Sequence, residues 1–271
     1  MLQGAIIVPY RLLALDLDGT LLDDDKTISE PNRKAIQAAQ DQGVMVTFST
    51  GRMYCSALRF ARELKMNVPL ITYNGALIKD TAGKVYQETS LSLPAARTAL
   101  AIAGEYNIHV NLFIRDELFV DRDDEWTERY RRSSSVMPQI VPNLEQVLAP
   151  GVNKVLLIGD EQELIPVRDV LGNKLADLAH ITSSNPQFIE IVHPDVSKQS
   201  GLSYLLEVFD MSPEKVIAIG DNYNDLEMIN FAGLGVAMAN APEDIRAQAD
   251  YVTGYNNEAG VAQVINKFIL S

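Results

Sequence analysis

The chain has 271 residues, 47% of them apolar and 22% charged, which is ordinary for a globular protein with a substantial buried core. Its formal charge of −13 excludes the basic surface needed for non-specific binding to nucleic acid or to an anionic membrane. No apolar stretch approaches the roughly 20 residues that span a bilayer. The single cysteine, Cys55, excludes an intramolecular disulfide and fits the reducing cytoplasm, where we expect the protein. We expect Cys55 to pack into the core from a helix.

The amino-terminal part of the chain predicts a parallel sheet. The apolar stretch at residues 2–8 is too short for the hydrophobic region of a signal peptide, and we expect an extension ahead of a first strand at 11–15. A helix is expected between Ser29, which can cap it, and Gly43, which can end it. The next elements are a strand at 44–48, a helix with Met53, Ala57, Phe60 and Leu64 on one face, and a strand at 69–73. Strands that alternate with helices over short connections indicate a doubly wound α/β fold.

The pattern changes between residues 86 and 189. The elements expected there are a helix at 94–106, a hairpin of 110–113 with 118–120, a charged helical stretch around Trp126, a strand at 155–158, a helix at 163–178, and short strands near Ile181 and Phe188. The alternation of strands and helices returns after residue 190, with strands at 215–219, 235–238 and 251–253 and a helix at 261–270. We therefore predict a discontinuous α/β core with a Rossmann-like parallel sheet at 10–85 and 190–271. An α+β cap domain is inserted at 86–189.

Two carboxylates follow the first strand, where Gly19 turns the chain into a loop. Asp16 and Asp18 would share a face if the strand continued. The loop lets both converge beyond the carboxyl end of the sheet, where open α/β sheets bind their ligands. Two such acids repel each other unless a cation lies between them, which favours a hard divalent metal ion. Taken without other motifs, two aspartates at this spacing are also compatible with a solvated acidic turn.

Polar side chains accompany the other expected elements of the core. They are Thr50 with the backbone of Gly51 after the second strand, Lys198 in a helix, and Asp221, Asn224 and Asp225 after the strand at 215–219. The carboxyl ends of parallel strands lie along one edge, so we expect these groups to meet there. Carboxylates can hold Mg²⁺, a lysine and a hydroxyl can bind phosphate oxygens, and a free carboxylate can attack phosphorus. The set therefore suits phosphoryl transfer.

Four clusters, in this order, resemble the motifs of the haloacid dehalogenase-like hydrolases. They are Asp-Leu-Asp-Gly-Thr at 16–20, Ser-Thr-Gly-Arg at 49–52, Lys198, and Gly-Asp-Asn-Tyr-Asn-Asp at 220–225. The long insert and the Asn-Gly-Ala at 74–76 are similar to the Cof-type branch of sugar-phosphate phosphatases. The resemblance covers nearly the whole chain from Arg11 onward. It departs at one point, because the family's lysine is commonly followed by glycine and Lys198 is followed by Gln199.

The resemblance implies a phosphoric monoester hydrolase with Mg²⁺ as cofactor and an aspartyl-phosphate intermediate. Asp16 would be the nucleophile, and Asp18 would protonate the leaving alkoxide and then activate water. The implied metal ligands are Asp16, Asp18 and Asp221, with Asp225 supporting the ion from outside its ligand shell. The implied phosphate- and substrate-binding residues are Thr50, Gly51, Lys198 and Asn224.

The expected substrate is a small phosphorylated metabolite, either a sugar phosphate or a phosphorylated cofactor, with no nucleic acid or membrane as partner. A phosphomutase, which passes the phosphoryl group to a sugar hydroxyl, would use the same residues. A phosphorylation-dependent switch of the receiver type also uses Mg²⁺ and an acceptor aspartate, but receivers are much shorter and have no inserted domain. The third alternative is a protein that binds a phosphate ligand without catalysis, and the filled catalytic positions argue against it.

Other polar residues have weaker signals. Arg52 can meet an anionic substrate or pair with an acid, and Asn74 is either a turn residue or part of the site. The histidines at 109, 180 and 193 have no metal-ligand spacing, so we expect structural or surface positions for them. The insert is expected to cover the site. Its charged and aromatic stretch at 121–130 either faces the substrate or forms a solvated helix face, which is the more usual case.

Overall fold

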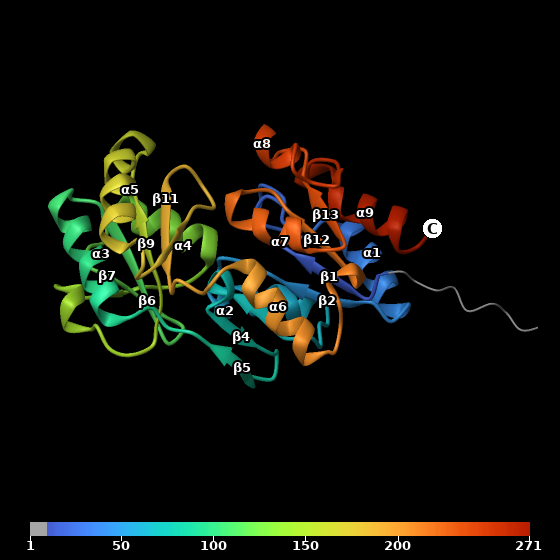
Figure 1. Cartoon of the computed structure of the whole chain (residues 1–271), viewed down its shortest axis with the longest axis horizontal. Helices are drawn as coiled ribbons and strands as arrows, with labels where there is room; N and C mark the ends of the chain where they lie inside the picture. The colour runs from blue at the N-terminus through green and yellow to red at the C-terminus, as the bar shows by residue number, and fades with distance from the viewer. Residues whose placement is uncertain (1–9) are drawn as a thin grey trace, which may run out of the picture.

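Five parallel strands form the central sheet, in the order β14-β13-β12-β1-β2 (Figure 1). The computed structural model describes residues 10–271, so the predicted extension at 2–8 lies outside the described residues. The strands are β1 Leu12–Leu15, β2 Met45–Phe48, β12 Val216–Gly220, β13 Leu234–Ala237 and β14 Tyr251–Val252. The chain extends the sheet in one direction from β1 to β2 and in the other from β12 to β14. The sheet is therefore doubly wound, and its direction of winding changes between β1 and β12.

Helices cover both faces of this sheet. Leu13 and Leu15 of β1 belong to one hydrophobic core, and Leu12 and Ala14 belong to another, as alternation along a strand requires. The helices on the first face are α1 Glu30–Asp41, α2 Tyr54–Glu63 and α9 Gly260–Phe268. Those on the second face are α6 Lys198–Val208 and α7 Leu226–Phe231, and the short α8 Glu243–Arg246 packs against α7. Burial of both faces explains why the strands are continuous apolar runs.

Beyond β2 the sheet continues as an antiparallel ribbon, which differs in part from the predicted third parallel strand at 69–73. The ribbon consists of β3 Leu70–Thr72, β4 Leu77–Lys79 and β5 Val85–Glu88. Only a bridge between Ser49 and Ile71 joins it in parallel to the β2 side. The chain reverses directly after β3 because Tyr73, Asn74 and Gly75 all have positive φ.

The insert forms a second sheet, with the order β10-β11-β9-β6-β7-β8. Its strands are β6 His109–Ile114, β7 Glu117–Val120, β8 Gln139–Ile140, β9 Val152–Ile158, β10 His180–Thr182 and β11 Phe188–Val192. β6 and β7 form the predicted antiparallel hairpin. α3 Leu93–Glu105 and α5 Glu161–Leu175 pack on one face, and α4 Glu125–Ser134 lies on the side toward the core (Figure 1). Phe113 and Leu156, on the core-facing side of the sheet, share a hydrophobic cluster with Tyr73 of the core.

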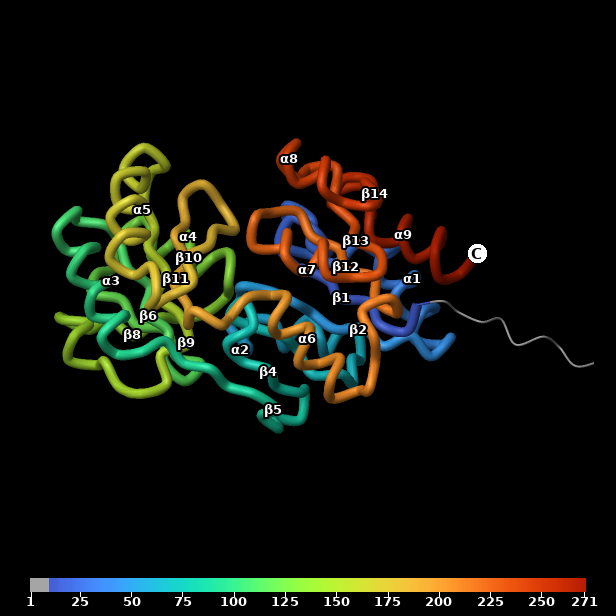
Figure 2. The backbone as a smooth tube through the Cα atoms, in the orientation of Figure 1, coloured from blue at the N-terminus to red at the C-terminus, as the bar shows by residue number. Residues whose placement is uncertain are grey.

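The chain crosses between the two domains after β5 and again after β11 (Figure 2). The boundaries expected at 85/86 and 189/190 each fall inside a strand. β5 pairs with β4 of the core, and β11 pairs with β9 of the cap along its length. We therefore propose a core of residues 10–90 and 193–271 and a cap of residues 91–192.

The predicted ends of α1 are present in the structure. The Ser29 side chain accepts a hydrogen bond from the backbone N–H of Asn32, and Gly43, with a φ of +85°, follows the helix. The expectation for Cys55 was wrong, since this residue is exposed in the first turn of α2. The apolar face of α2 is made by residues three and four apart, such as Ala57 and Phe60, and Cys55 lies off that face. Within residues 10–271, none of the helices combines the length and the apolar character of a membrane span.

Gly75 approaches the start of α6 so closely that a side chain has no room. A Cβ at Gly75 would lie 2.3 Å from the carbonyl oxygen of Ser197, whereas a Cβ at Gly83 would meet nothing within 4 Å. Both glycines have positive φ. We expect Gly75→Ala to lower the free energy of unfolding by about 3 kcal/mol or more and Gly83→Ala by about 1 kcal/mol, because only the first adds a clash to the cost of a left-handed alanine. Chemical denaturation measures both values, and equal losses would contradict this account.

Candidate active site

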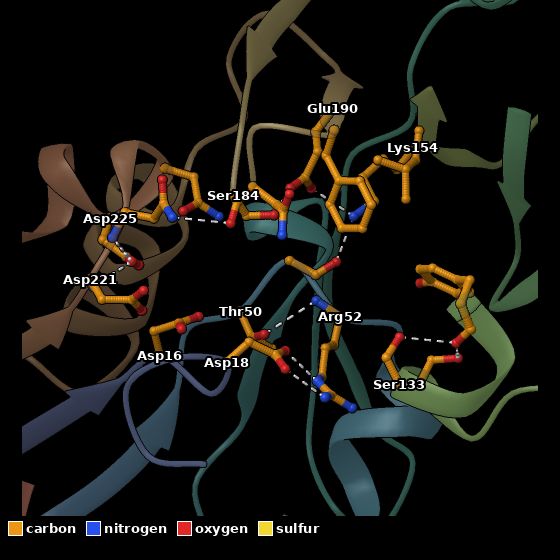
Figure 3. Close-up of a pocket in the computed structure, with 18 of the residues that line it drawn as sticks. Asp16, Asp18, Thr50, Arg52, Ser133, Lys154, Ser184, Glu190, Asp221 and Asp225 are labelled. Atoms are coloured by element: carbon orange, nitrogen blue, oxygen red, sulfur yellow. Dashed lines mark hydrogen bonds and ion pairs between the residues drawn. The ribbon is translucent and has the colours of Figure 1, made fainter. Parts of the chain in front are cut away.

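A cavity of about 190 Å³ lies between the carboxyl edge of the central sheet and the cap (Figure 3). It is lined by every predicted site residue except Lys198, which contacts Asp16 from behind the cavity wall. Asp16 follows β1 and Asp221 follows β12, so the cavity lies where the direction of winding changes, the usual ligand position in such sheets. In Figure 3, Asp221 and Asp225 lie on one side of Asp16 and Arg52 on the other.

Lys198 is buried between two carboxylates. Its Nζ donates hydrogen bonds to Oδ1 of Asp16 and to Oδ1 of Asp225, both at 2.6 Å. Burial alone would lower the pKa of Lys198, but the charges of Asp16 and Asp225 raise it above its ordinary value, so the ammonium stays charged. Lys198 is the first residue of α6, and Ser197 caps this helix by accepting from the N–H of Ser200. The helix therefore begins normally, although Gln199 replaces the glycine common in the family.

Asp16, Asp221 and Asp225 form an acidic cluster in which one carboxylate oxygen of each lies within 4.8 Å of the others. Burial raises the pKa of Asp16 to about 7 and outweighs the opposing charge of Lys198; the charges of Asp225 and Asp18 add to the rise. Burial, followed by the charges of Asp16 and Asp225, also raises the pKa of Asp221 well above its ordinary range. One ammonium does not neutralise three acids, so the cluster favours a further cation.

The three acids differ in how many of their oxygens are already engaged. Asp225 uses Oδ1 for Lys198, and its Oδ2 accepts from the backbone N–H groups of Asp221 and Asn222 at 3.0 Å. Asp221 accepts only from the Thr20 hydroxyl, at 2.7 Å, among the described residues. The cluster therefore offers Asp16 and Asp221 as metal ligands, while Asp225 holds the loop that carries Asp221.

Asp18 faces away from this cluster. Arg52 binds its carboxylate with both arms of the guanidinium, at 2.5 Å from Nε and 2.7 Å from Nη2, and Nζ of Lys26 lies 3.0 Å from Oδ1. Burial alone would raise the pKa of Asp18, but the hydrogen bonds and charge of Arg52, with the charge of Lys26, lower it to about 2. The Asp18 side chain therefore lies outside the acidic cluster, and its role as a metal ligand beside Asp16 stays a prediction.

The loop with Thr50 and Gly51 forms another side of the cavity. Thr50 is buried, and its Oγ1 accepts from the N–H of Arg52 at 3.2 Å. A Cβ at Gly51 would lie 3.0 Å from Oδ1 of Asn74, so this position suits glycine. Nδ2 of Asn224 donates to that same Asn74 oxygen at 3.1 Å. Asn74 is therefore part of the site, one of the two possibilities that its sequence position left open.

The cap contributes residues that the sequence analysis missed. Lys154 and Glu190 form a buried ion pair at 2.7 Å in the cavity wall, and Glu190 also accepts from Asn74 and Ser184. Burial alone would raise the pKa of Glu190, but Lys154 and these donors lower it, so it remains ionised. The signal was available, because Glu190 interrupts the otherwise apolar β11 and Lys154 lies in β9, where only Asn153 is also polar. Tyr130 also lines the cavity, so the stretch at 121–130 faces the site at this residue, one of the two possibilities that the sequence left open.

Lys198 provides a test of the electrostatics of the cluster. We expect Lys198→Met to lower the free energy of unfolding by about 3–5 kcal/mol near pH 8, because the substitution leaves buried carboxylates without their cation. The pKa of Asp16, already raised, would rise further. The native state would then keep a proton that the unfolded state releases above about pH 4, so the loss should be smaller near pH 5. Denaturation at both pH values measures this, with the exposed Lys174→Met as control. A loss independent of pH would contradict the charge explanation.

Comparison with known proteins places this site in a family. The family model described as haloacid dehalogenase-like hydrolase matches residues 13–265. The chain is 34% identical, over 96% of its length and 97% of the relative's, to the 5-amino-6-(5-phospho-D-ribitylamino)uracil phosphatase YitU of Bacillus subtilis. The phosphatase YcsE of that organism, which bears the same name, is 32% identical over 97% of each chain. The crystal structure of a haloacid dehalogenase-like hydrolase from Bacteroides thetaiotaomicron superposes with a TM-score of 0.86, at 34% identity, covering 95% of this chain and 99% of that one. The chain therefore belongs to the haloacid dehalogenase-like hydrolases, in their Cof-type branch, and is an enzyme of the phosphatase class.

Proposed function

We propose that the protein is a Mg²⁺-dependent phosphatase that hydrolyses small phosphorylated metabolites through an aspartyl-phosphate on Asp16. The observation that carries the proposal is the buried contact between Lys198 and Oδ1 of Asp16 at the wall of the cavity. Within residues 10–271, no hydrogen bond reaches Oδ2 of Asp16. The carboxylate is thus fixed through one oxygen and has a second oxygen to offer to phosphorus, as a nucleophile requires.

Mg²⁺ fits the residues present, because the acidic cluster needs a positive charge and consists of the oxygen ligands that this ion prefers. Asp16 and Asp221 would hold it with their carboxylates. The predicted contribution of Asp18 would require its side chain to leave Arg52, with which it is paired. When bound, the ion would neutralise the negative charge shared by the carboxylates and the phosphate group.

In the first step, a carboxylate oxygen of Asp16 attacks phosphorus and the bond from phosphorus to the leaving oxygen breaks. Asp18 gives its proton to the leaving alkoxide. Thr50 and Gly51 bind the transferring group through a hydroxyl and a backbone N–H, and Lys198 stabilises its charge. Asn224, which lines the cavity, would also contact the phosphate.

In the second step, Asp18 accepts a proton from a water molecule whose oxygen attacks phosphorus. The bond to Asp16 then breaks and inorganic phosphate leaves. The pKa of Asp18, lowered to about 2 by Arg52 and Lys26, keeps its carboxylate ionised, which is the form that can accept a proton. For the first step Asp18 must carry a proton. An incoming phosphate group competes for Arg52 and Lys26, and the loss of these partners returns the pKa of Asp18 toward its ordinary value.

The part of the cavity wall formed by the cap combines hydroxyl and amide groups with aromatic rings. Ser133, Ser184 and Asn185 offer hydrogen bonds, and Tyr130 and Phe188 offer flat apolar surface. Such a wall supports a leaving group that joins a chain of hydroxyls to a ring. The Bacillus subtilis relatives are named for a compound of this kind, 5-amino-6-(5-phospho-D-ribitylamino)uracil, which is therefore the first substrate to test.

The nucleophile is tested by Asp16→Asn with p-nitrophenyl phosphate as substrate in the presence of Mg²⁺. We expect turnover to fall at least ~10³-fold, equivalent to about 4 kcal/mol in the barrier, because an amide does not form the acyl phosphate. Asp25→Asn is the matched control, since this exposed aspartate in the same loop makes no hydrogen bond or ion pair within the described chain. Near-normal turnover of Asp16→Asn would remove Asp16 from the mechanism.

The metal site is tested by thermal unfolding with Mg²⁺ or EDTA. We expect Mg²⁺ to raise Tm more near pH 8 than near pH 6, because the pKa of Asp16 is about 7 and protons compete with the ion below it. Since the pKa of Asp221 is raised in the fold, its ionised form costs stability above about pH 4. Asp221→Asn should therefore raise Tm in EDTA near pH 8 and abolish the rise caused by Mg²⁺. A Mg²⁺ effect that survives this substitution would place the ion elsewhere.

A further inference from the structure

Four residue pairs join the cap by hydrogen bonds to one segment of the core, residues 51–59, which runs from the phosphate-binding loop into α2. Lys154 Nζ donates to the Gly51 carbonyl at 2.7 Å, and the carboxylate of Asp116 accepts from the N–H of Cys55 at 3.2 Å. The other two join Ser56 Oγ to the Ser134 carbonyl at 2.8 Å and Arg59 Nη1 to Ser135 Oγ at 2.7 Å. The cap thus contacts the segment that carries part of the proposed phosphate site.

The start of α2 has no cap from its own chain segment. Its N-cap residue, Met53, makes no side-chain hydrogen bond. Asp116, in the turn between β6 and β7 of the cap, supplies one from the other domain. Its two oxygens lie 3.3 and 3.2 Å from the backbone nitrogen of Cys55, the second residue of the helix. An N-cap aspartate accepts from this position in its own helix, and a carboxylate suits the positive end of the helix dipole.

The same carboxylate also reaches the neighbouring loop of the site. It accepts from the Tyr73 hydroxyl at 2.7 Å, and Tyr73 is fully buried. The backbone N–H of Tyr73 donates to the carbonyl of Arg52, and that of Asn74 donates to the carbonyl of Thr50, both at 3.0 Å. Asp116 therefore contacts both the start of α2, which follows the loop with Thr50 and Gly51, and the turn at 73–75 that is hydrogen-bonded to that loop.

Arg52 connects this contact to the reacting groups. It lies just before α2, and its guanidinium holds Asp18, while its Nη1 donates to Ser56 Oγ in the first turn of the helix at 3.0 Å. A shift of the first turn would displace Arg52 and, through it, Asp18.

We infer that Asp116 is a positioning residue for the reaction. By capping α2 from the cap domain, it holds Arg52 and Asp18 in place, so the site is complete only when the cap lies on the core. The effect on turnover rests on the proposed function. The turn itself agrees with this role. Arg115 and Asp116 form its two-residue connection with φ of +52° and +65°, where Asn-Gly is the usual choice. A left-handed conformation at two residues other than glycine costs energy, which the contacts of Asp116 offset.

The test compares Asp116→Ala and Asp116→Asn with the wild type and with Asp177→Ala, a control at an exposed aspartate of the cap. Turnover of p-nitrophenyl phosphate with Mg²⁺ is measured together with amide hydrogen exchange in residues 52–60. We expect Asp116→Ala to exchange faster there and to lose about tenfold in kcat, the size of effect expected from a lost helix cap. KM should change less than kcat, because Asp18 acts in the chemical steps. Asp116→Asn should lie in between, since its side-chain oxygen still accepts from Cys55.

Two results would overturn the inference. Faster exchange with an unchanged kcat would make the contact structural only, and a lower kcat with unchanged exchange would mean that Asp116 acts by another route. If Asp116→Ala does not fold, Asp116→Asn and Tyr73→Phe, which removes only the hydroxyl donor, decide by the same comparison. If the wild type cleaves no phosphate ester, the proposed function fails. In that case only amide hydrogen exchange in residues 52–60 tests the capping contact, and unchanged exchange in the variants would reject that contact as well.

Discussion

The ammonium of Lys198, held at 2.6 Å from both Asp16 and Asp225, is the contact on which the rest of the site depends. This contact joins two segments that are far apart in the sequence, since Lys198 follows Asp16 by 182 residues. Buried carboxylates repel strongly where water does not screen them, and the parallel sheet brings three of them to one edge. One lysine compensates only part of this charge. The remainder explains the raised pKa values of Asp16 and Asp221, and it is the reason for proposing a divalent ion there.

Two aspartates only two residues apart thus have opposite surroundings. Burial and like charges raise the pKa of Asp16 to about 7, whereas Arg52 and Lys26 lower that of Asp18 to about 2. Such a separation is what a nucleophile beside an acid–base group requires, because the two must respond differently to the same ligands. A metal ion would neutralise the charge of Asp16, whereas the phosphate of the substrate would compete with Asp18 for Arg52 and Lys26.

The cap does more than cover the cavity. Lys154 donates to the carbonyl of Gly51, and Glu190 accepts from Asn74, so a buried ion pair of the cap fixes two loops of the core. Asp116 completes the start of α2 from the same domain. Each of these contacts would be lost if the cap moved away. In the proposed reaction, binding of the leaving group and the arrangement of the reacting residues would therefore be coupled through the same interface.

The sequence by itself determined the elements and the ends of the strands that carry the site. Apolar runs closed by polar residues predict β1 and β12, and the rule that parallel strands end at one edge brings Asp16, Asp221 and Asp225 together. The same reasoning missed the reversal after β3, which depends on three successive residues with positive φ, and it left Asp18 beside Asp16. Only the tertiary structure decided that Asp18 turns to Arg52 and that Lys154, Glu190 and Asp116 reach the core. The apolar pattern of a helix or strand indicates which of its faces is buried. The pairings named here depend instead on how the cap packs on the core, which brings together residues that are far apart in the sequence.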